Sequence, residues 1–325
     1  MHRFYASAVI RKEMLYINGQ WIQGHGKAFS SENPATGELL WQGHAADTAQ
    51  VEAAVASARR AFPDWRDTPV DARVEVLTAF QTYLQTHKHT LISKISEETG
   101  KVSWDAASEA AAAIGKLKFS LAAYEERTPT REQVLPAGRA VLTHRPHGVL
   151  AVYGPYNFPA HLPGGHIIPA LLAGNSVVFK PSELTPGVGE WLVRAWEAAG
   201  LPAGVLNLLQ GEREVGVALS QADIDGLLFT GSSATGKHLH AQFAGRPEIL
   251  LALELGGNNP LIVSTVADAR AAALETILSA YISSGQRCTC ARRLIVVGEQ
   301  AAFLDALTQM MISVRVGAAG DAPEA

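Results

Sequence analysis

The sequence predicts an α/β protein organised around a parallel β-sheet. The pattern changes at Gly148, after which short apolar runs alternate with helix-length segments. These runs are apolar throughout, as in strands that are covered on both faces. Most of them are followed by glycine or polar residues, at the sheet edge where ligands bind in open parallel sheets. The predicted strands are VLAVYG, SVVFKP, GVLNLL, GLLFTG and ILLALEL.

The segments before the sheet divide into a terminal extension, a turn-rich stretch, helices and a hairpin. Residues 1–13 are too short and polar for a secretion signal, and we expect them to be a disordered extension. Residues 15–45 are rich in turns, and residues 127–147 are extended around a PAGR turn that can form a protruding hairpin. Amphipathic helical patterns cover residues 48–61, 70–87 and 101–124.

A second, smaller α/β unit follows Glu254. It consists of a helix over residues 267–283, a strand RRLIVVG and a helix from Glu299. Only about 70 residues follow Glu254, and the chain ends in a loop-like VRVGAAGDAPEA. We therefore expect this unit to be incomplete and the chain to be truncated.

Composition narrows the class of protein. The chain has 325 residues, which is long enough for two domains, and 47% of them are hydrophobic. Its net charge of −4 gives no global attraction to nucleic acid or to an anionic membrane, and no apolar run approaches the roughly 20 residues of a membrane span. Two cysteines, Cys288 and Cys290, are too few for a disulfide framework. We expect a cytoplasmic protein without nucleic-acid or membrane partners.

The stretch LLFTGSSATGKH contains most of a nucleotide-binding loop. An NTPase loop requires Ser or Thr after the lysine as a Mg²⁺ ligand, but His238 follows Lys237 here, which argues against Mg-ATP. What is left is a Gly/Ser turn between a strand and a helix expected from Ala234, and such a turn directs N–H groups at an anion. A dinucleotide pyrophosphate and a purely structural turn both fit this pattern.

Cys288 is a candidate nucleophile. It lies in SGQRCTCARR, where the neighbouring Arg287, Arg292 and Arg293 favour the thiolate, which is the attacking form in covalent catalysis. The alternative is a structural or inert surface thiol. Cys290 follows two residues later, but no further cysteine or nearby histidine cluster completes a metal site, so we expect no metal.

Two other polar residues follow predicted strands. Glu254 ends an apolar run before two glycines, and burial there would raise the pKa of its carboxyl group toward that of a general base; otherwise it is an ordinary strand-end residue. Asn157, in GPYNFP, can donate to an oxyanion or simply occupy a turn.

The segment FKPSE follows a predicted strand and carries Lys180 and Glu183. A carboxylate at this place accepts from ribose hydroxyls and repels a 2′-phosphate. The alternative is a helix start with Ser182 as its cap and Glu183 at its positive end. His161 and His166 are five residues apart, off the spacing of a helical metal pair, which favours a structural or substrate-edge role.

Five segments together resemble the aldehyde dehydrogenase superfamily from about Met14 to the end of the chain. They are PYNFP, PALLAGNSVVFKPSE, FTGSSATG, LELGGNNP and GQRC, in that order. The resemblance implies a doubly wound NAD-binding domain, a β-hairpin flap for oligomerisation and a partial α/β catalytic domain. The implied boundaries are residues 14–130 with 148–254, then 131–147, then 255–325.

The resemblance also implies the chemistry. Cys288 attacks an aldehyde to give a thioester, Asn157 and the Cys288 backbone N–H hold the oxyanion, and Glu254 activates the hydrolytic water. The implied NAD contacts are Lys180, Ser182, Glu183, Gly231, Ser232, Ser233, Ala234, Thr235, Gly236 and Leu255.

Within the superfamily, the sequence is most similar to enzymes that oxidise N-succinyl-L-glutamate 5-semialdehyde in bacterial arginine breakdown. Such a substrate carries carboxylates, so basic groups should line its path, with Arg287 and Arg292 as candidates by charge alone. The alternatives are a dehydrogenase for another semialdehyde and an inactive NAD-binding fragment. The family's C-terminal third is absent, so we expect this chain to be poorly active and the full-length form to be a homo-oligomer.

Overall fold

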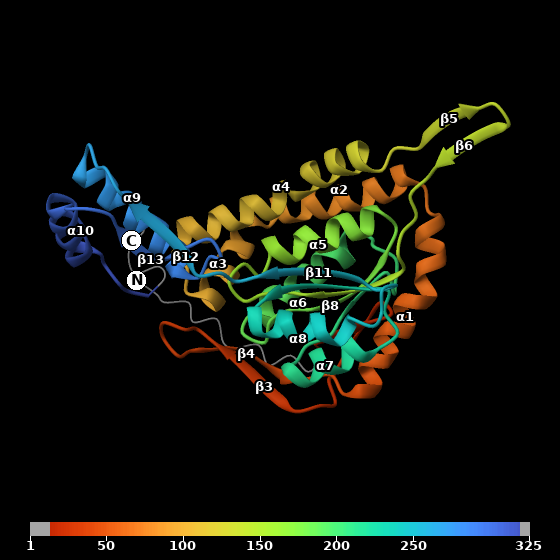
Figure 1. The fold of residues 1–325 in the computed structure, drawn as a ribbon. Helices are drawn as coiled ribbons and strands as arrows, with labels where there is room; N and C mark the ends of the chain where they lie inside the picture. The colour runs from red at the N-terminus through yellow and green to blue at the C-terminus, as the bar shows by residue number, and fades with distance from the viewer. Residues whose placement is uncertain (1–13, 319–325) are drawn as a thin grey trace.

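A seven-stranded sheet forms the centre of the computed structural model, which describes residues 14–318 (Figure 1). Its strand order is β11-β10-β7-β8-β9-β1-β2; the first five strands run parallel, and β1 and β2 add antiparallel at one edge. The parallel strands are β7 (Val149–Tyr153), β8 (Ser176–Lys180), β9 (Leu206–Leu208), β10 (Gly226–Gly231) and β11 (Leu250–Leu255). The parallel sheet predicted from the apolar runs is therefore confirmed.

Helices cover both faces of the sheet, because alternate side chains of each buried strand point to opposite sides. Leu150 and Val152 of β7 face one apolar cluster, whereas Val149 and Ala151 face the other. Figure 1 shows α2, α4 and α5 on one side of the sheet and α7 and α8 on the other. The first cluster includes α2 (Val70–Thr86), α3 (Lys88–Thr99), α4 (Ser103–Arg127), α5 (His161–Leu172) and α6 (Pro186–Ala198); the second includes α1 (Thr48–Asp67), α7 (Arg213–Gln221) and α8 (Ser233–Phe243).

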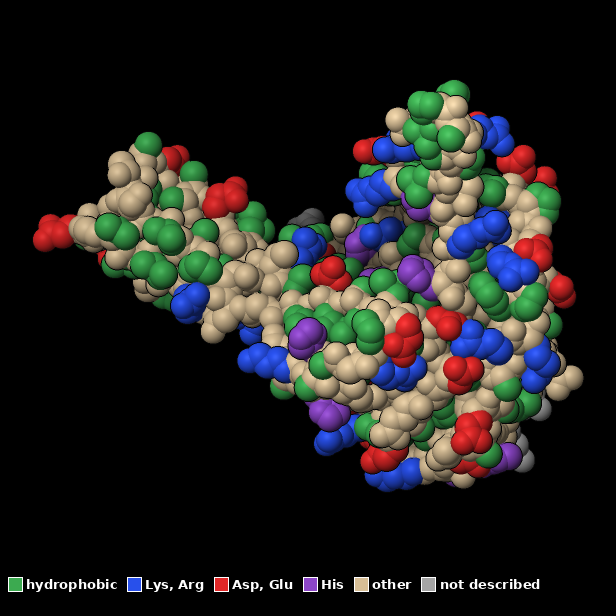
Figure 2. Space-filling view, turned by 45° about the vertical axis from the view of Figure 1, so that its right-hand side comes forward, with side chains coloured by type: hydrophobic (Ala, Val, Ile, Leu, Met, Phe, Trp, Pro, Cys, Tyr) green, Lys and Arg blue, Asp and Glu red, His purple; other side chains and the backbone are tan. Residues whose placement is uncertain are grey.

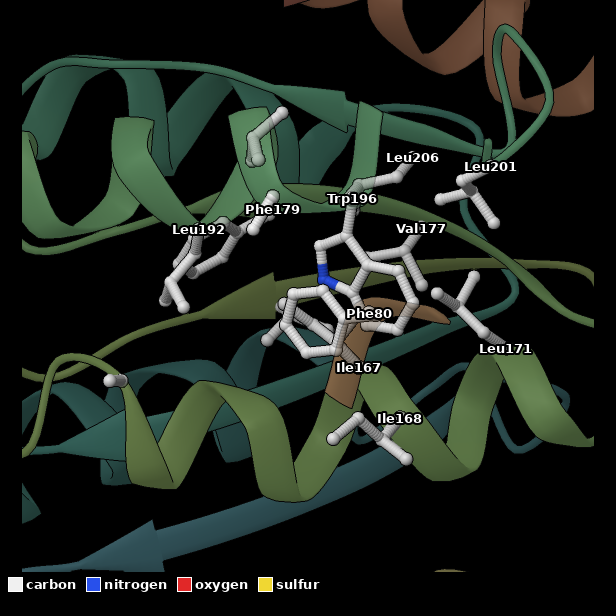
Figure 3. Packing of buried hydrophobic residues seen from close by; sticks show 14 of the residues in the cluster. Phe80, Ile167, Ile168, Leu171, Val177, Phe179, Leu192, Trp196, Leu201 and Leu206 are labelled. Carbon is white, nitrogen blue, oxygen red and sulfur yellow. The ribbon is translucent and has the colours of Figure 1, made fainter. Parts of the chain in front are cut away.

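The larger core fixes α5 against the sheet. Phe80 of α2 stacks on Trp196 of α6 with ring centroids 3.6 Å apart, and Ile167 and Leu171 of α5 lie in the same cluster (Figure 3). Each large apolar side chain buried in this way contributes about 1.5–3 kcal/mol. Because α5 begins four residues after Asn157, this packing also positions the loop that carries Asn157.

The N-terminal strands were not identified from the sequence. Residues 15–45, expected only to be turn-rich, form two antiparallel pairs, and α3 lies in a segment without a predicted element. Strands of three residues are too short to show an alternating pattern. The pairs are β1 (Leu15–Ile17) with β2 (Gln20–Ile22), and β3 (Ala28–Glu32) with β4 (Leu39–His44).

An antiparallel hairpin projects from the body at the upper right of Figure 1. It consists of β5 (Arg131–Leu135) and β6 (Gly138–Leu142), and every residue in both strands is exposed. The exposed residues include Val134 and Leu142, so the hairpin has an apolar surface without a partner among the described residues.

The C-terminal residues form a small separate layer at the left of Figure 1. A parallel pair, β12 (Asn259–Val263) and β13 (Ala291–Val296), packs with α9 (Ala269–Tyr281) and α10 (Ala301–Ser313) around Ala273, Phe303 and Leu307. Within residues 14–318, no helix is both long and apolar enough to cross a membrane. The extension expected at residues 1–13 lies outside the described residues.

Candidate active site

Cys288 lies in a turn that enters β13 and begins with strained backbone. The short 3₁₀ segment Ile282–Gly285 contains Ser283 at φ 56° and Ser284 at φ 55°. The left-handed region costs a non-glycine residue about 1–2 kcal/mol, so neighbouring contacts must hold this conformation. Cys288 is exposed, whereas Cys290 is buried with its Sγ 3.5 Å from the carbonyl oxygen of Ile282. The turn therefore presents only one of the two thiols to a ligand.

Arginine side chains supply part of this support. Arg287 donates through Nε to Ser283 Oγ at 2.8 Å and through Nη2 to Asp105 Oδ1 at 3.1 Å. Arg292 Nη2 lies 3.3 Å from the carbonyl oxygen of Gly285. Charge alone had favoured Arg287 and Arg292 as groups for a substrate carboxylate. Both guanidinium groups thus help to hold the turn, and their contact with a substrate carboxylate stays a prediction.

Two asparagine amides hold the backbone of the turn around Cys288. Asn157 donates through Nδ2 to the Gln286 carbonyl at 2.6 Å, and Asn259 donates through Nδ2 to the Cys288 carbonyl at 2.7 Å. An amide nitrogen carries two hydrogens, so the second N–H of Asn157 is left for a ligand. Asn259 was missed from the sequence, although its position in GGNNP, soon after Glu254, was a signal.

Glu254 is the penultimate residue of β11, directly opposite Thr230 of β10. Its side chain is exposed, so the expected burial of this carboxylate is wrong for this chain. His166 Nε2 lies 3.3 Å from Thr230 Oγ1. Burial lowers the pKa of His166, and the charge of Glu254 partly opposes this shift. The carboxylate thus lies at the carboxyl end of the sheet, where water can reach it.

The glycine turn leads into α8 as the sequence indicates. Ser232 caps the helix, with its Oγ accepting from the Thr235 backbone N–H at 3.2 Å, and the helix begins at Ser233, one residue before the expected start. A Cβ on Gly236 would lie 2.3 Å from Leu255 Cδ2, so only glycine allows α8 to pack this closely on β11. First-turn N–H groups lack intrahelical partners, and residues Ser232 to Thr235 are exposed, so an anion can reach them.

Lys180, the last residue of β8, lies beside Glu183. Lys180 Nζ donates to the Pro181 carbonyl at 2.9 Å and lies 3.7 Å from Glu183 Oε2; burial lowers the pKa of this lysine. Ser182 Oγ accepts from the Leu184 N–H at 3.2 Å. The alternative interpretation of Ser182 as a helix cap is wrong, because α6 begins only at Pro186.

A carboxylate from another helix caps α6 instead. Glu98 of α3 accepts from the Gly187 and Val188 N–H groups, each at 2.8 Å. Burial raises the pKa of Glu98 to about 7, although both hydrogen bonds act in the opposite direction. This contact fixes the start of α6 and thereby the segment after β8 that carries Ser182 and Glu183.

A buried ion pair, also missed from the sequence, connects α4 to the start of α5. Lys101 Nζ lies 2.7 Å from Glu109 Oε2, and neither side chain is exposed. Glu109 Oε1 also accepts from the N–H groups of Ala160 and His161 at 3.0 and 3.2 Å. The available signal was the spacing of Asp105 and Glu109, which are four residues apart on the alanine-rich buried face of α4.

Two other kinds of site among the described residues were candidates: a metal site and a cavity away from the sheet edge. No group of three or more His, Cys, Asp or Glu side chains in residues 14–318 is placed to hold a metal ion. A cavity of about 580 Å³ between α1 and α7, lined by Thr48 and Arg213 among others, contains none of the predicted site residues. The polar groups at the carboxyl end of the sheet, with the Cys288 turn beside them, are therefore the candidate site.

The sheet topology and the exposed cysteine held by two asparagine amides fit a family of enzymes that the comparison with known proteins also finds. The aldehyde dehydrogenase family model matches residues 21–324, and the chain belongs to that family. It is 57% identical over 301 residues to N-succinylglutamate 5-semialdehyde dehydrogenase of Pseudomonas fluorescens (strain Pf0-1), covering 92% of this chain and 61% of that protein. Identity to the protein of the same name from Paraburkholderia xenovorans (strain LB400) is 54%, covering 93% and 63%. The chain thus spans about three-fifths of these relatives.

Solved structures confirm the fold class. Methylmalonate-semialdehyde dehydrogenase (DddC) from Oceanimonas doudoroffii superposes with a TM-score of 0.90 at 31% identity, covering 96% of this chain and 65% of that one. NADP-dependent glyceraldehyde-3-phosphate dehydrogenase from Bacillus halodurans C-125, complexed with NADP, gives 0.86 at 28% identity, covering 95% and 66%. The α/β aldehyde dehydrogenase fold is therefore shown for this chain.

Proposed function

We propose that this chain carries the nucleophile and the cofactor site of an NAD-dependent aldehyde dehydrogenase acting on N-succinyl-L-glutamate 5-semialdehyde. The observation that carries the proposal is the exposed Cys288 turn, whose backbone is held by Asn157 at Gln286 and by Asn259 at Cys288. The substrate follows from the similarity to relatives that bear this activity in their name. The product is N-succinyl-L-glutamate, within arginine breakdown in the cytoplasm.

The proposed chemistry begins at the sulfur. The Cys288 thiolate adds to the aldehyde carbon, and the carbonyl π electrons move to oxygen, where the second Asn157 N–H and the Cys288 backbone N–H donate. NAD, which the first turn of α8 and Glu183 would hold, would supply the acceptor for the hydride that leaves this carbon. The acyl group then remains on sulfur as a thioester. Glu254 takes a proton from water as the water attacks that carbon; the C–S bond breaks and the thiolate is regenerated.

The proposed cofactor contacts fit the residues that are present. The exposed first turn of α8 provides unpaired N–H groups for a pyrophosphate, and the close packing of Gly236 on Leu255 holds that turn at the end of β10. The half-exposed Glu183 carboxylate can accept from a ribose and would repel a 2′-phosphate, which supports NAD over NADP. Lys180 lies beside it and orients the carboxylate.

Acetylation by p-nitrophenyl acetate tests the nucleophile without a full catalytic cycle. We expect one acetyl group on the peptide containing Cys288, and we expect Cys288→Ala to lose both this adduct and ester hydrolysis. Cys290→Ser is the matched control, because the buried Cys290 thiol should not contribute. Hydrolysis at the unchanged rate in Cys288→Ala would remove Cys288 from the role.

A second function, NAD binding without turnover, is favoured by the exposure of Glu254 and by the small core of the C-terminal layer. It predicts that NAD binds while Cys288 is not acetylated. We further propose that the β5–β6 hairpin mediates homo-oligomer formation, supported by its exposed apolar residues. Sedimentation of the chain with and without Val134→Asp measures this contribution directly.

A further inference from the structure

Three basic side chains lie where α4 packs against α5. Lys116 of α4 lies against Gly165 of α5, and a Cβ on that glycine would be 3.4 Å from the lysine Nζ. The charge of Lys116 also acts on His161 and His166, which flank Gly165 along α5. These three side chains, Lys116, His161 and His166, form what we call the basic cluster.

Lys116 is partly buried but lacks the carboxylate partner that the buried lysines Lys101 and Lys180 have. Lys101 is paired with Glu109 and Lys180 with Glu183, but no carboxylate among the described residues forms an ion pair with Lys116. Burial lowers the pKa of the Lys116 ammonium group. A desolvated cation without a partner costs free energy, which a bound anion can offset. This position is therefore suited to a carboxylate.

The basic cluster faces the candidate active site. His166 bonds Thr230 opposite Glu254, and the charge of Arg287, next to Cys288, acts on His161. His161 Nδ1 is buried and has no hydrogen-bond partner within residues 14–318. Figure 2 shows a hollow below the projection at the top of the view, with histidine and Lys or Arg side chains on its walls.

We propose that the basic cluster binds a carboxylate at the end of the substrate remote from the aldehyde, so that Lys116 selects anionic aldehydes. This proposal rests on the proposed function, in which Cys288 attacks the aldehyde. Burial lowers the pKa of His161 to about 4, so at neutral pH this ring is uncharged and Lys116 supplies the charge.

Two alkylating reagents of similar size but different charge test this assignment. Iodoacetate is an anion and iodoacetamide is neutral, so the ratio of their rates at Cys288 reports the local potential. We expect Lys116→Met to lower the iodoacetate to iodoacetamide ratio by about three- to tenfold, the effect of removing one partly screened charge. Lys118→Met is the matched control, because Lys118 is exposed on the same helix and should leave the ratio within about twofold.

A protection measurement provides the second readout. N-succinyl-L-glutamate should slow alkylation of Cys288 by iodoacetamide in the unmodified chain, in Lys118→Met and in Lys116→Arg, but not in Lys116→Met. An unchanged rate ratio and undiminished protection in Lys116→Met would overturn the carboxylate site. Failure of either reagent to label Cys288 in the unmodified chain would instead overturn the proposed function. The two failures are therefore distinguishable.

Discussion

At the scale of single residues, the site depends on a cysteine that is presented by a strained turn. Ser283 and Ser284 adopt left-handed backbone, and Arg287 ties this turn to Asp105, which is 1% exposed on α4. Strain of this kind persists where surrounding contacts over-determine the conformation. The reactivity of Cys288 should therefore depend on a residue that never touches the substrate.

Asp105→Ala tests this dependence. The substitution leaves Arg287 without its carboxylate, and we expect the free energy of unfolding to fall by about 1–3 kcal/mol, since the guanidinium is partly exposed. We also expect the iodoacetamide rate at Cys288 to change, because the turn loses its anchor. Ser108→Ala, exposed on the same helix, is the control. An unaltered alkylation rate in a destabilised Asp105→Ala would show that the anchor does not position the thiol.

Glu98 gives a pH-dependent test. Its pKa rises from 4.5 to about 7 on folding, so between these values the folded chain holds a proton that the unfolded chain releases. The stability from this group is present below its ordinary pKa and is lost as pH rises through 7, by about 3 kcal/mol. Glu98→Gln should remove this slope from urea unfolding measured between pH 5 and 8, and Glu97→Gln should retain it. Identical slopes in both variants would contradict the account.

At the scale of elements, two helices meet the site through their N-termini. Glu109 of α4 accepts from the first N–H groups of α5, and α8 begins at the exposed glycine turn. The positive end of a helix favours a carboxylate or phosphate at this place. The N-terminus of α5 is therefore filled by the Glu109 carboxylate, whereas the N-terminus of α8 is open to a ligand.

Glu109→Ala tests the filled N-terminus of α5. It leaves Lys101 buried without a partner, and we expect a loss of about 3–5 kcal/mol in the free energy of unfolding. The double substitution Lys101→Met with Glu109→Leu should recover much of that loss, because no unpaired charge remains. Denaturant unfolding of the original chain and these two variants measures both effects. A single variant as stable as the original chain would contradict the assigned role of the pair.

Gly236→Ala tests the open N-terminus of α8. The added methyl group would overlap Leu255, so α8 must shift from β11 at a cost of about 1–3 kcal/mol. We expect weaker NAD binding by calorimetry, because the N–H groups of the turn move with the helix. Gly245→Ala, where the structure has open space, should leave affinity unchanged. Equal affinity in the two variants would argue against binding at this turn.

The elements of the sheet could be predicted because parallel strands buried on both faces give long apolar runs. Short strands such as β1 show no such pattern, and the exposure of Glu254 depends on what packs over β11. Motif resemblance predicted roles for Cys288 and Asn157, and the structure places both residues at the same turn. The pairing of Asn259 with Cys288, or of Lys101 with Glu109, joins positions whose contact only the fold creates. A single sequence gives little indication of such contacts.

At the scale of the whole molecule, the two layers differ in the size of their cores. The central sheet lies between two extensive apolar clusters. Among the described residues, the cluster of the C-terminal layer buries only Ala273, Phe303 and Leu307. Ile262 and Ile312 of that layer are 63% and 75% exposed. Because Cys288 lies in this layer, its position depends on the least stabilised part of the described chain.

Hydrogen exchange should reveal this difference. Amides of β12 and α10 have few buried contacts to protect them, so we expect them to exchange through openings of lower free energy than those of β7 and β8. Mass spectrometry of peptic peptides measures both regions in one sample. Equal protection in the two layers would contradict the picture of a weakly held C-terminal layer.

The central claim is that Cys288 carries the acyl group during oxidation of the aldehyde. The most direct test is to mix the chain with N-succinyl-L-glutamate 5-semialdehyde and NAD, quench in acid and measure the peptide masses by mass spectrometry. The account predicts that the peptide containing Cys288 gains the N-succinylglutamyl mass only when NAD is present, and that Glu254→Gln increases this fraction by slowing hydrolysis. An acyl group on any other residue, or NADH formed at the original rate by Cys288→Ala, would contradict it.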